Sequence, residues 1–152
     1  MLRRKPSELA REEPKLVRQE LGLSKQTVQD LLLAAVQKFK DANQTSISAP
    51  TRMEVAYDAI LFCALALFAA LGYRVQSLPG HHKVAIEGLA AEVPLSSSLH
   101  DEVLALQDLR HTKYSGFTQA SDADLKAALQ LAQRVLTETE NWFQAKKPEL
   151  LK

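Results

Sequence analysis

A run of 15 uncharged residues, Ala59 to Tyr73, lies between Asp58 and Arg74 and is the most apolar stretch of the chain. A transmembrane helix needs about 20 such residues. The run is therefore predicted to form a helix that is buried on nearly all sides, and the rest of the chain must supply the surfaces that cover it. Cys63, the single cysteine, lies inside the run and is expected to be a small core residue in a reducing compartment.

The composition favours one all-α domain. The 152 residues are 46% hydrophobic and 6% aromatic, and the stretches rich in Ala, Leu and Gln carry few β-branched residues. β-Sandwiches, barrels and βαβ folds need such residues in their strands. We therefore predict an antiparallel, up-down bundle of four to five helices over residues 24–146. Residues 1–23 are expected to be a solvated or loosely docked basic arm or short helix, and residues 147–152 a tail.

Apolar residues spaced three and four apart predict the individual helices. The expected helices cover residues 24–41, 51–74, 82–91, 98–115 and 121–147. Residues that suit helix N-termini indicate where three of them begin. Thr51 with Glu54 fits a capping box, in which each side chain bonds a free backbone amide, and Ser98 and Ser121 precede the last two helices.

The charges are nearly balanced, with 19 Lys and Arg against 18 Asp and Glu, a net charge of +1. Proteins that bind nucleic acid over their whole surface carry a stronger basic field. Only residues 1–26, with seven basic and four acidic groups, are locally basic. Because Glu8, Glu12 and Glu13 stand where a signal peptide would have its apolar region, we expect a cytoplasmic protein that makes no membrane contact.

A single arginine interrupts the apolar face of the helix predicted over residues 98–115. At 100° per residue, one band of that helix contains Leu99, Val103, Leu106, Arg110 and Tyr114. A guanidinium group stays charged in proteins and is costly to bury alone. Arg110 is therefore expected to face a carboxylate, a polar cleft or a subunit interface.

Two interpretations of Arg110 follow. In the first, Arg110 forms a buried ion pair, with Asp58 or Glu54 as the candidate partner. In the second, Arg110 lies at a cleft and binds phosphate, for which the fork of guanidinium donors is suited. His111 and Tyr114 would then stand beside it as groups for proton transfer or hydrogen bonding.

Three short motifs, in their order along the chain, resemble the HEPN superfamily. They are Tyr57-Asp58-Ala59-Ile60 at the entry to the long apolar helix, Gly80-His81-His82 before a short helix, and Leu109-Arg110-His111-Thr112-Lys113-Tyr114. The resemblance covers roughly residues 27–144. It implies a helical bundle that commonly forms homodimers and works on RNA or nucleotides. Such proteins act as metal-independent RNase toxins, as partners of minimal nucleotidyltransferases, or as non-catalytic relatives.

The resemblance also implies which residues form the site. Catalytic members carry an arginine, a polar residue directly after it, and a histidine a few positions later. Arg110 and His111 match the start of that motif, but positions 115–117 are Ser, Gly and Phe, and Tyr114 stands near the place of the missing histidine. The implied catalytic residues are therefore Arg110, His111 and Tyr114. The implied supporting polar residues are Tyr57, Asp58, His81, His82 and Lys113.

No metal and no cofactor is expected. His81 and His82 are adjacent, whereas a zinc pair on a helix uses residues four apart together with a third ligand. The chain also lacks a P-loop and a glycine-rich dinucleotide motif.

Two functions remain open. The first is a HEPN-like, homodimeric protein of bacterial type that binds or acts on RNA or nucleotides. It would be a metal-independent endoribonuclease toxin, or a toxin–antitoxin component with a nucleotidyltransferase-type antitoxin as its partner. The second is a non-catalytic, homodimeric protein-interaction module in which Arg110 forms a structural ion pair.

Overall fold

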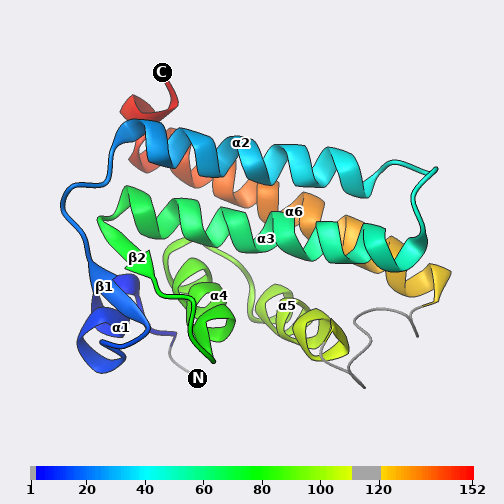
Figure 1. Ribbon diagram of the computed structural model, residues 1–152, viewed down its shortest axis with the longest axis horizontal. Helices are drawn as coiled ribbons and strands as arrows, with labels where there is room; N and C mark the ends of the chain where they lie inside the picture. The colour runs from blue at the N-terminus through cyan, green and yellow to red at the C-terminus, as the bar shows by residue number, and fades with distance from the viewer. Residues whose placement is uncertain (1–2, 111–120) are drawn as a thin grey trace.

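The computed structural model describes residues 3–110 and 121–152, and most of these residues are helical, which confirms the all-α class (Figure 1). In chain order the elements are α1 (Pro6–Glu12), β1 (Val17–Gln19), α2 (Lys25–Ala42), α3 (Ala49–Ala70), β2 (Tyr73–Val75), α4 (His81–Glu92), α5 (Ser97–Arg110), α6 (Asp122–Lys146) and the 3-10 helix η2 (Pro148–Leu151). The two short strands are the part of this architecture that the composition did not predict.

Helix α3 is the central element of the bundle. Figure 1 shows α2 and α6 lying along it, with α4 and α5 packed on another side. Ile60, Cys63 and Leu67 are all buried, which confirms the expected placement of the cysteine. By length and composition α3 could cross a membrane, but 61% of its most apolar window is buried inside the protein. That burial is typical of the core helix of a bundle.

The three longest helices do not alternate strictly in direction. Helices α2 and α3 are joined by a short connection and run antiparallel, whereas α6 runs alongside α3 in the same direction (Figure 1). A bundle is therefore present, but the expected up-down order is not confirmed.

The boundaries of α3 differ from those predicted. The helix begins at Ala49, because proline is tolerated in a first turn and Pro50 takes that place. The capping box predicted for Thr51 and Glu54 is therefore wrong. Thr51 accepts a hydrogen bond from the Ser48 hydroxyl, and the Glu54 carboxylate is used elsewhere.

The N-terminal segment is not a loosely docked arm. Leu9 of α1 and Val17 of β1 are almost completely buried in the common core. The Glu87 carboxylate on α4 accepts hydrogen bonds from the backbone N–H of Arg4 at 2.7 Å and from its Nε and Nη2 at 2.9 and 3.1 Å. The expected short helix is present as α1, but the expectation of loose docking was wrong, because contacts with residues as distant in the chain as Glu87 leave no local pattern in the sequence.

The two strands form an antiparallel ribbon between segments far apart in the chain. Val17 pairs with Val75, Arg18 with Arg74 and Gln19 with Tyr73. Gly72 has a φ of +87°, a conformation that favours glycine, and it turns the chain from α3 into β2. Strands of three residues are too short to show an alternating pattern in the sequence, so nothing predicted them.

Serine side chains begin the last two helices. At α6, Ser121 and Asp124 form the reciprocal pair of hydrogen bonds of a capping box, which confirms that helix start. At α5, the hydroxyl of Ser96, not that of Ser98, accepts a hydrogen bond from a first-turn N–H, at 3.1 Å from Leu99. The predicted N-terminus of α5 was therefore two residues late.

Close packing of α4 against α3 predicts an effect of Gly88→Ala. A Cβ at Gly88 would overlap the ring of Phe68, so we expect a loss of about 1 to 3 kcal/mol in the free energy of unfolding. The matched control is Gly22→Ala, since a Cβ there meets no atom within 4 Å. Urea denaturation of both variants is the measurement, and equal stability of the two would contradict this packing.

Candidate functional site

Arg110 is the last residue of α5, and its position follows from the packing of that helix. Leu99, Val103 and Leu106 on the same band are buried against the bundle, so the band directs Arg110 toward α3. The Arg110 side chain is 28% exposed. It lies at the edge of the core and reaches solvent.

Glu54 is the partner of Arg110. The Arg110 Nε donates a hydrogen bond to Glu54 Oε2 at 3.0 Å, which makes Glu54, of the two carboxylates proposed as partners, the one that forms the ion pair. The guanidinium carbon also lies 5.2 Å from the centroid of the Tyr57 ring, within the range of a cation–π contact. Glu54 and Tyr57 are three residues apart on α3, so they present their side chains to Arg110 from neighbouring turns.

The pair is only partly buried. The Glu54 side chain is 37% exposed, compared with 28% for Arg110. A buried pair was one of the two expectations, and that detail is wrong. Because water still reaches both groups, the pair contributes far less to stability than a fully desolvated pair would.

Tyr57 links this pair to α4. Its ring is completely buried, and its hydroxyl lies 2.8 Å from Nδ1 of His82, the second residue of α4. Burial raises the pKa of the Tyr57 hydroxyl to about 12, although the positive charge of Arg110 acts in the opposite direction. Tyr57 is therefore a neutral hydrogen-bonding group at physiological pH, in contact with both Arg110 and His82.

The two adjacent histidines have different partners. Nδ1 of His81 donates a hydrogen bond to the backbone carbonyl of Leu78 at 2.7 Å, while His82 contacts Tyr57. The two imidazole rings meet edge to face, with centroids 4.2 Å apart. Both histidines are partly buried. Gly80, with a φ of +91°, begins the helix that directs them apart.

Asp58, one turn after Glu54 on α3, lies near Arg110 but is not its ion-pair partner. Burial raises the pKa of its carboxyl group, and the nearby charge of Glu54 acts in the same direction. Lys38 on α2 and Arg110 lower that pKa and offset part of the effect. Asp58 thus adds a second, partly desolvated carboxyl group to the same part of α3 as Glu54.

The structure therefore brings together five polar side chains, which we call the Arg110 cluster. Its members are Glu54, Tyr57, Asp58, His82 and Arg110, and His81 adjoins it through His82. The other expected site residues, His111, Lys113 and Tyr114, lie outside the described residues.

Gln107, one turn before Arg110 on α5, was not predicted as a site residue. It is 4% exposed, and its Oε1 has no hydrogen-bond partner within the described ranges. A buried acceptor of this kind is uncommon. The only signal in the sequence is the spacing, since Gln107 lies three residues before Arg110.

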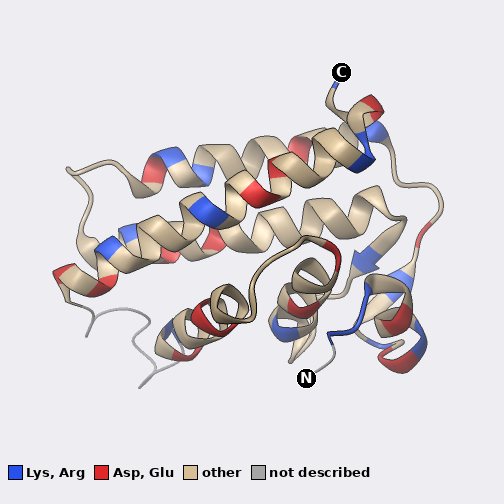
Figure 2. Ribbon diagram, turned by 180° about the vertical axis from the view of Figure 1, so that it is seen from behind, with Lys and Arg blue, Asp and Glu red and all other residues tan. Residues whose placement is uncertain are grey.

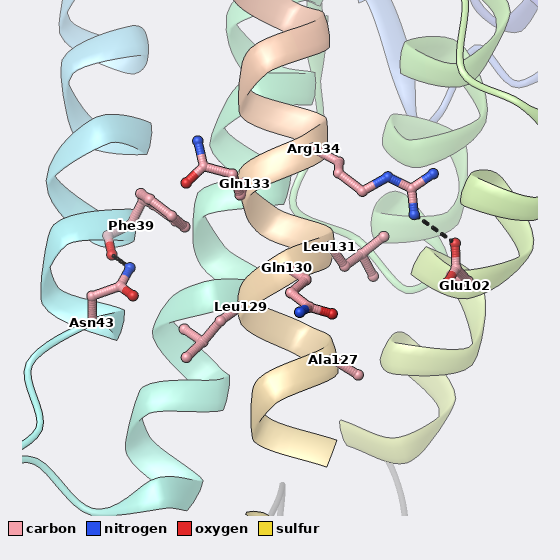
Figure 3. A pocket seen from close by; sticks show the side chains of 9 residues that line it. All are labelled: Phe39, Asn43, Glu102, Ala127, Leu129, Gln130, Leu131, Gln133 and Arg134. Atoms are coloured by element: carbon pink, nitrogen blue, oxygen red, sulfur yellow. Dashed lines mark hydrogen bonds and ion pairs between the residues drawn. The ribbon is translucent and has the colours of Figure 1, made fainter. Parts of the chain in front are cut away.

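A pocket of about 500 Å³ lies apart from the Arg110 cluster, along α6 (Figure 3). In Figure 3, Phe39 points from α2 toward α6, and Arg134 of α6 reaches Glu102 of α5. That ion pair spans 3.4 Å and is about half exposed. No member of the Arg110 cluster lines this pocket.

Metal ligands do not converge anywhere in the part of the chain that the structure describes: no three His, Cys, Asp or Glu residues come together there. The described chemistry of the cluster consists of hydrogen bonding, one cation and two carboxylates. Of these groups, the guanidinium of Arg110 is the one suited to bind and orient a phosphate.

Removing Arg110 is expected to cost little stability. For Arg110→Ala we expect a loss of about 1 kcal/mol or less in the free energy of unfolding, because the pair is partly exposed. Thermal and urea unfolding measure this loss. A double-mutant cycle with Glu54→Ala separates the contribution of the ion pair between Arg110 and Glu54 from that of the contact between Arg110 and Tyr57. A loss of about 3 kcal/mol or more would instead identify a fully desolvated structural pair.

The raised pKa of Tyr57 predicts a loss of stability in alkali. The unfolded chain releases this proton near its ordinary value of about 10, whereas the folded protein holds it to about 12. This contribution is therefore complete below about pH 10 and disappears as the pH rises toward about 12. Between about pH 10 and 12, the free energy of unfolding measured with urea should fall less steeply for Tyr57→Phe than for the wild type. Parallel curves for the two proteins would refute the assignment.

No family model, no curated protein and no solved structure matches the chain.

Proposed function

We propose that this chain is a HEPN-like protein that binds RNA or nucleotides, with Arg110 as the residue that contacts phosphate. One observation carries the proposal: Glu54 holds the guanidinium through Nε, while the group rests on the Tyr57 ring. A guanidinium has five N–H donors, so the contact through Nε leaves its outer nitrogens able to bind a phosphate. Glu54 and Tyr57 therefore orient Arg110 without occupying all of its N–H donors.

The proposed reaction is metal-independent cleavage of RNA. The ribose 2′-oxygen attacks the adjacent phosphorus, a base accepts the 2′ proton, and an acid supplies a proton to the departing 5′-oxygen. Arg110 would stabilise the negative charge that develops on the phosphate. The resemblance assigns the proton transfers to His111 and Tyr114, and the hydrogen bond from Tyr57 to His82 would keep the surrounding groups in place.

The proposal extends to the assembly and its setting. A homodimer would place two Arg110 clusters on either side of one cleft, as the resemblance implies. The same resemblance suggests a nucleotidyltransferase-type antitoxin as partner, in a cytoplasmic toxin–antitoxin pair. The burial of α3, the most apolar helix, is compatible with a soluble dimer of this kind.

A second function is favoured by a different aspect of the same contact. Because Arg110 does form an ion pair with Glu54, it could serve only to join α5 to α3 in a non-catalytic, homodimeric interaction module. This alternative predicts that changes at Arg110 alter the assembly or its stability and leave RNA untouched.

Cleavage of RNA in the presence of a chelator tests the first function. A labelled RNA of mixed sequence should be cut by the wild-type protein, and Arg110→Ala should lower the rate by about 100-fold or more, as expected when a donor to a developing charge is lost. Arg134→Ala, which removes an arginine from an exposed pair on α6, is the matched control and should cut at the wild-type rate. Intact RNA with wild-type protein would favour the interaction module.

A further inference from the structure

The two-stranded ribbon places like charges directly opposite one another. Arg18 of β1 is the cross-strand partner of Arg74 of β2, and both side chains are exposed. Figure 2 shows basic residues on both strands. Like charges at opposed positions of an antiparallel pair destabilise it. The opposed pair of Arg18 and Arg74 therefore does not stabilise the ribbon.

Only part of this charge is compensated within the protein. Glu20 accepts a hydrogen bond from Nε of Arg74, so one arginine has a carboxylate partner. Across residues 3–110 and 121–152, no carboxylate lies within ion-pair distance of Arg18 or Lys15. Two positive charges beside the ribbon are thus available for an anion.

These charges line one shallow hollow of about 720 Å³. Its lining contains the three basic residues Lys15, Arg18 and Arg74, the polar residues Gln76 and Ser77, and no acidic residue. We call it the ribbon hollow. An open surface with several cations and with hydrogen-bonding side chains beside them suits a chain of phosphates better than a compact ligand enclosed on all sides.

The ribbon hollow is connected to the Arg110 cluster. Leu78 lines the edge of the hollow, and its backbone carbonyl accepts a hydrogen bond from His81. The ring of His81 contacts the ring of His82, which is hydrogen-bonded to Tyr57 of the cluster. The N-terminus of α4 therefore stands between the ribbon hollow and the Arg110 cluster and contacts residues of both.

We propose that the ribbon hollow binds the sugar–phosphate backbone of single-stranded RNA and guides it toward Arg110. This inference rests on the proposed function, because it assumes that the ligand of the Arg110 cluster is RNA. Lys15 and Arg18 supply the uncompensated charges, and Arg74 adds a third. The contacts are to phosphates, so the surface should bind RNA with little preference for sequence.

The test is binding of a labelled 2′-O-methyl oligouridylate of about 20 nucleotides, which lacks the 2′-hydroxyl needed for cleavage. Fluorescence anisotropy at several salt concentrations gives the slope of log K against log salt. For Lys15→Gln/Arg18→Gln we expect weaker binding and a slope shallower by about 1.4, because each single-strand phosphate contact contributes about 0.7. The control is Lys40→Gln/Lys126→Gln, which removes the same charge from exposed positions on α2 and α6.

Each outcome decides a different point. Equal slopes for the two double variants overturn the ribbon hollow but leave the proposed function intact if Arg110→Ala still loses cleavage. Weaker binding by Lys15→Gln/Arg18→Gln alone supports RNA binding in the ribbon hollow, even if no RNA is cut. If labelled polyglutamate of matched charge binds as tightly as the oligouridylate, with the same dependence on Lys15 and Arg18, the surface is assigned to an acidic protein and our inference is wrong.

Discussion

The rest of the structure depends on covering α3. This helix is apolar on nearly all sides, and burying its surface is the main source of stability that its composition provides. Four helices and the N-terminal segment are arranged around it for that purpose. Its two acidic residues, Glu54 and Asp58, lie in its first half and retain access to water. The candidate site is therefore built on a part of α3 that the surrounding elements cover only partly.

That placement explains how the cluster holds an arginine at modest cost. Full burial of Arg110 with Glu54 would require removing both ions from water, a penalty that their attraction often fails to offset. At the rim of the core, the pair keeps part of its hydration, while the buried Tyr57 ring provides a fixed surface beneath the guanidinium. The hydrogen bond between Tyr57 and His82 and the contact of Arg110 with the Tyr57 ring then connect α4 and α5 through α3.

The sequence predicted the parts of the protein whose signal is local. The apolar run of α3, the start of α6 at Ser121 and the need of Arg110 for a partner could each be read from neighbouring residues. The ribbon and the docked N-terminal segment could not, because their stability comes from partners more than 50 positions away, such as Val75 for Val17 and Glu87 for Arg4. The choice of Glu54 over Asp58 also depended on three-dimensional packing, since both lie on the same helix and one turn apart.

The distant partners of the N-terminal segment also set an order of events in folding. During synthesis, β1 leaves the ribosome long before β2 exists, and Arg4 must wait for Glu87 on α4. Contacts of such high sequence separation form late, because the intervening chain must first be closed into a loop. The buried side chains of Leu9 and Val17 consequently remain exposed in the nascent chain until α3 and α4 are in place. The segment that carries Leu9 and Val17 is thus made before the partners that bury it and is among the last parts of the fold to reach its final position.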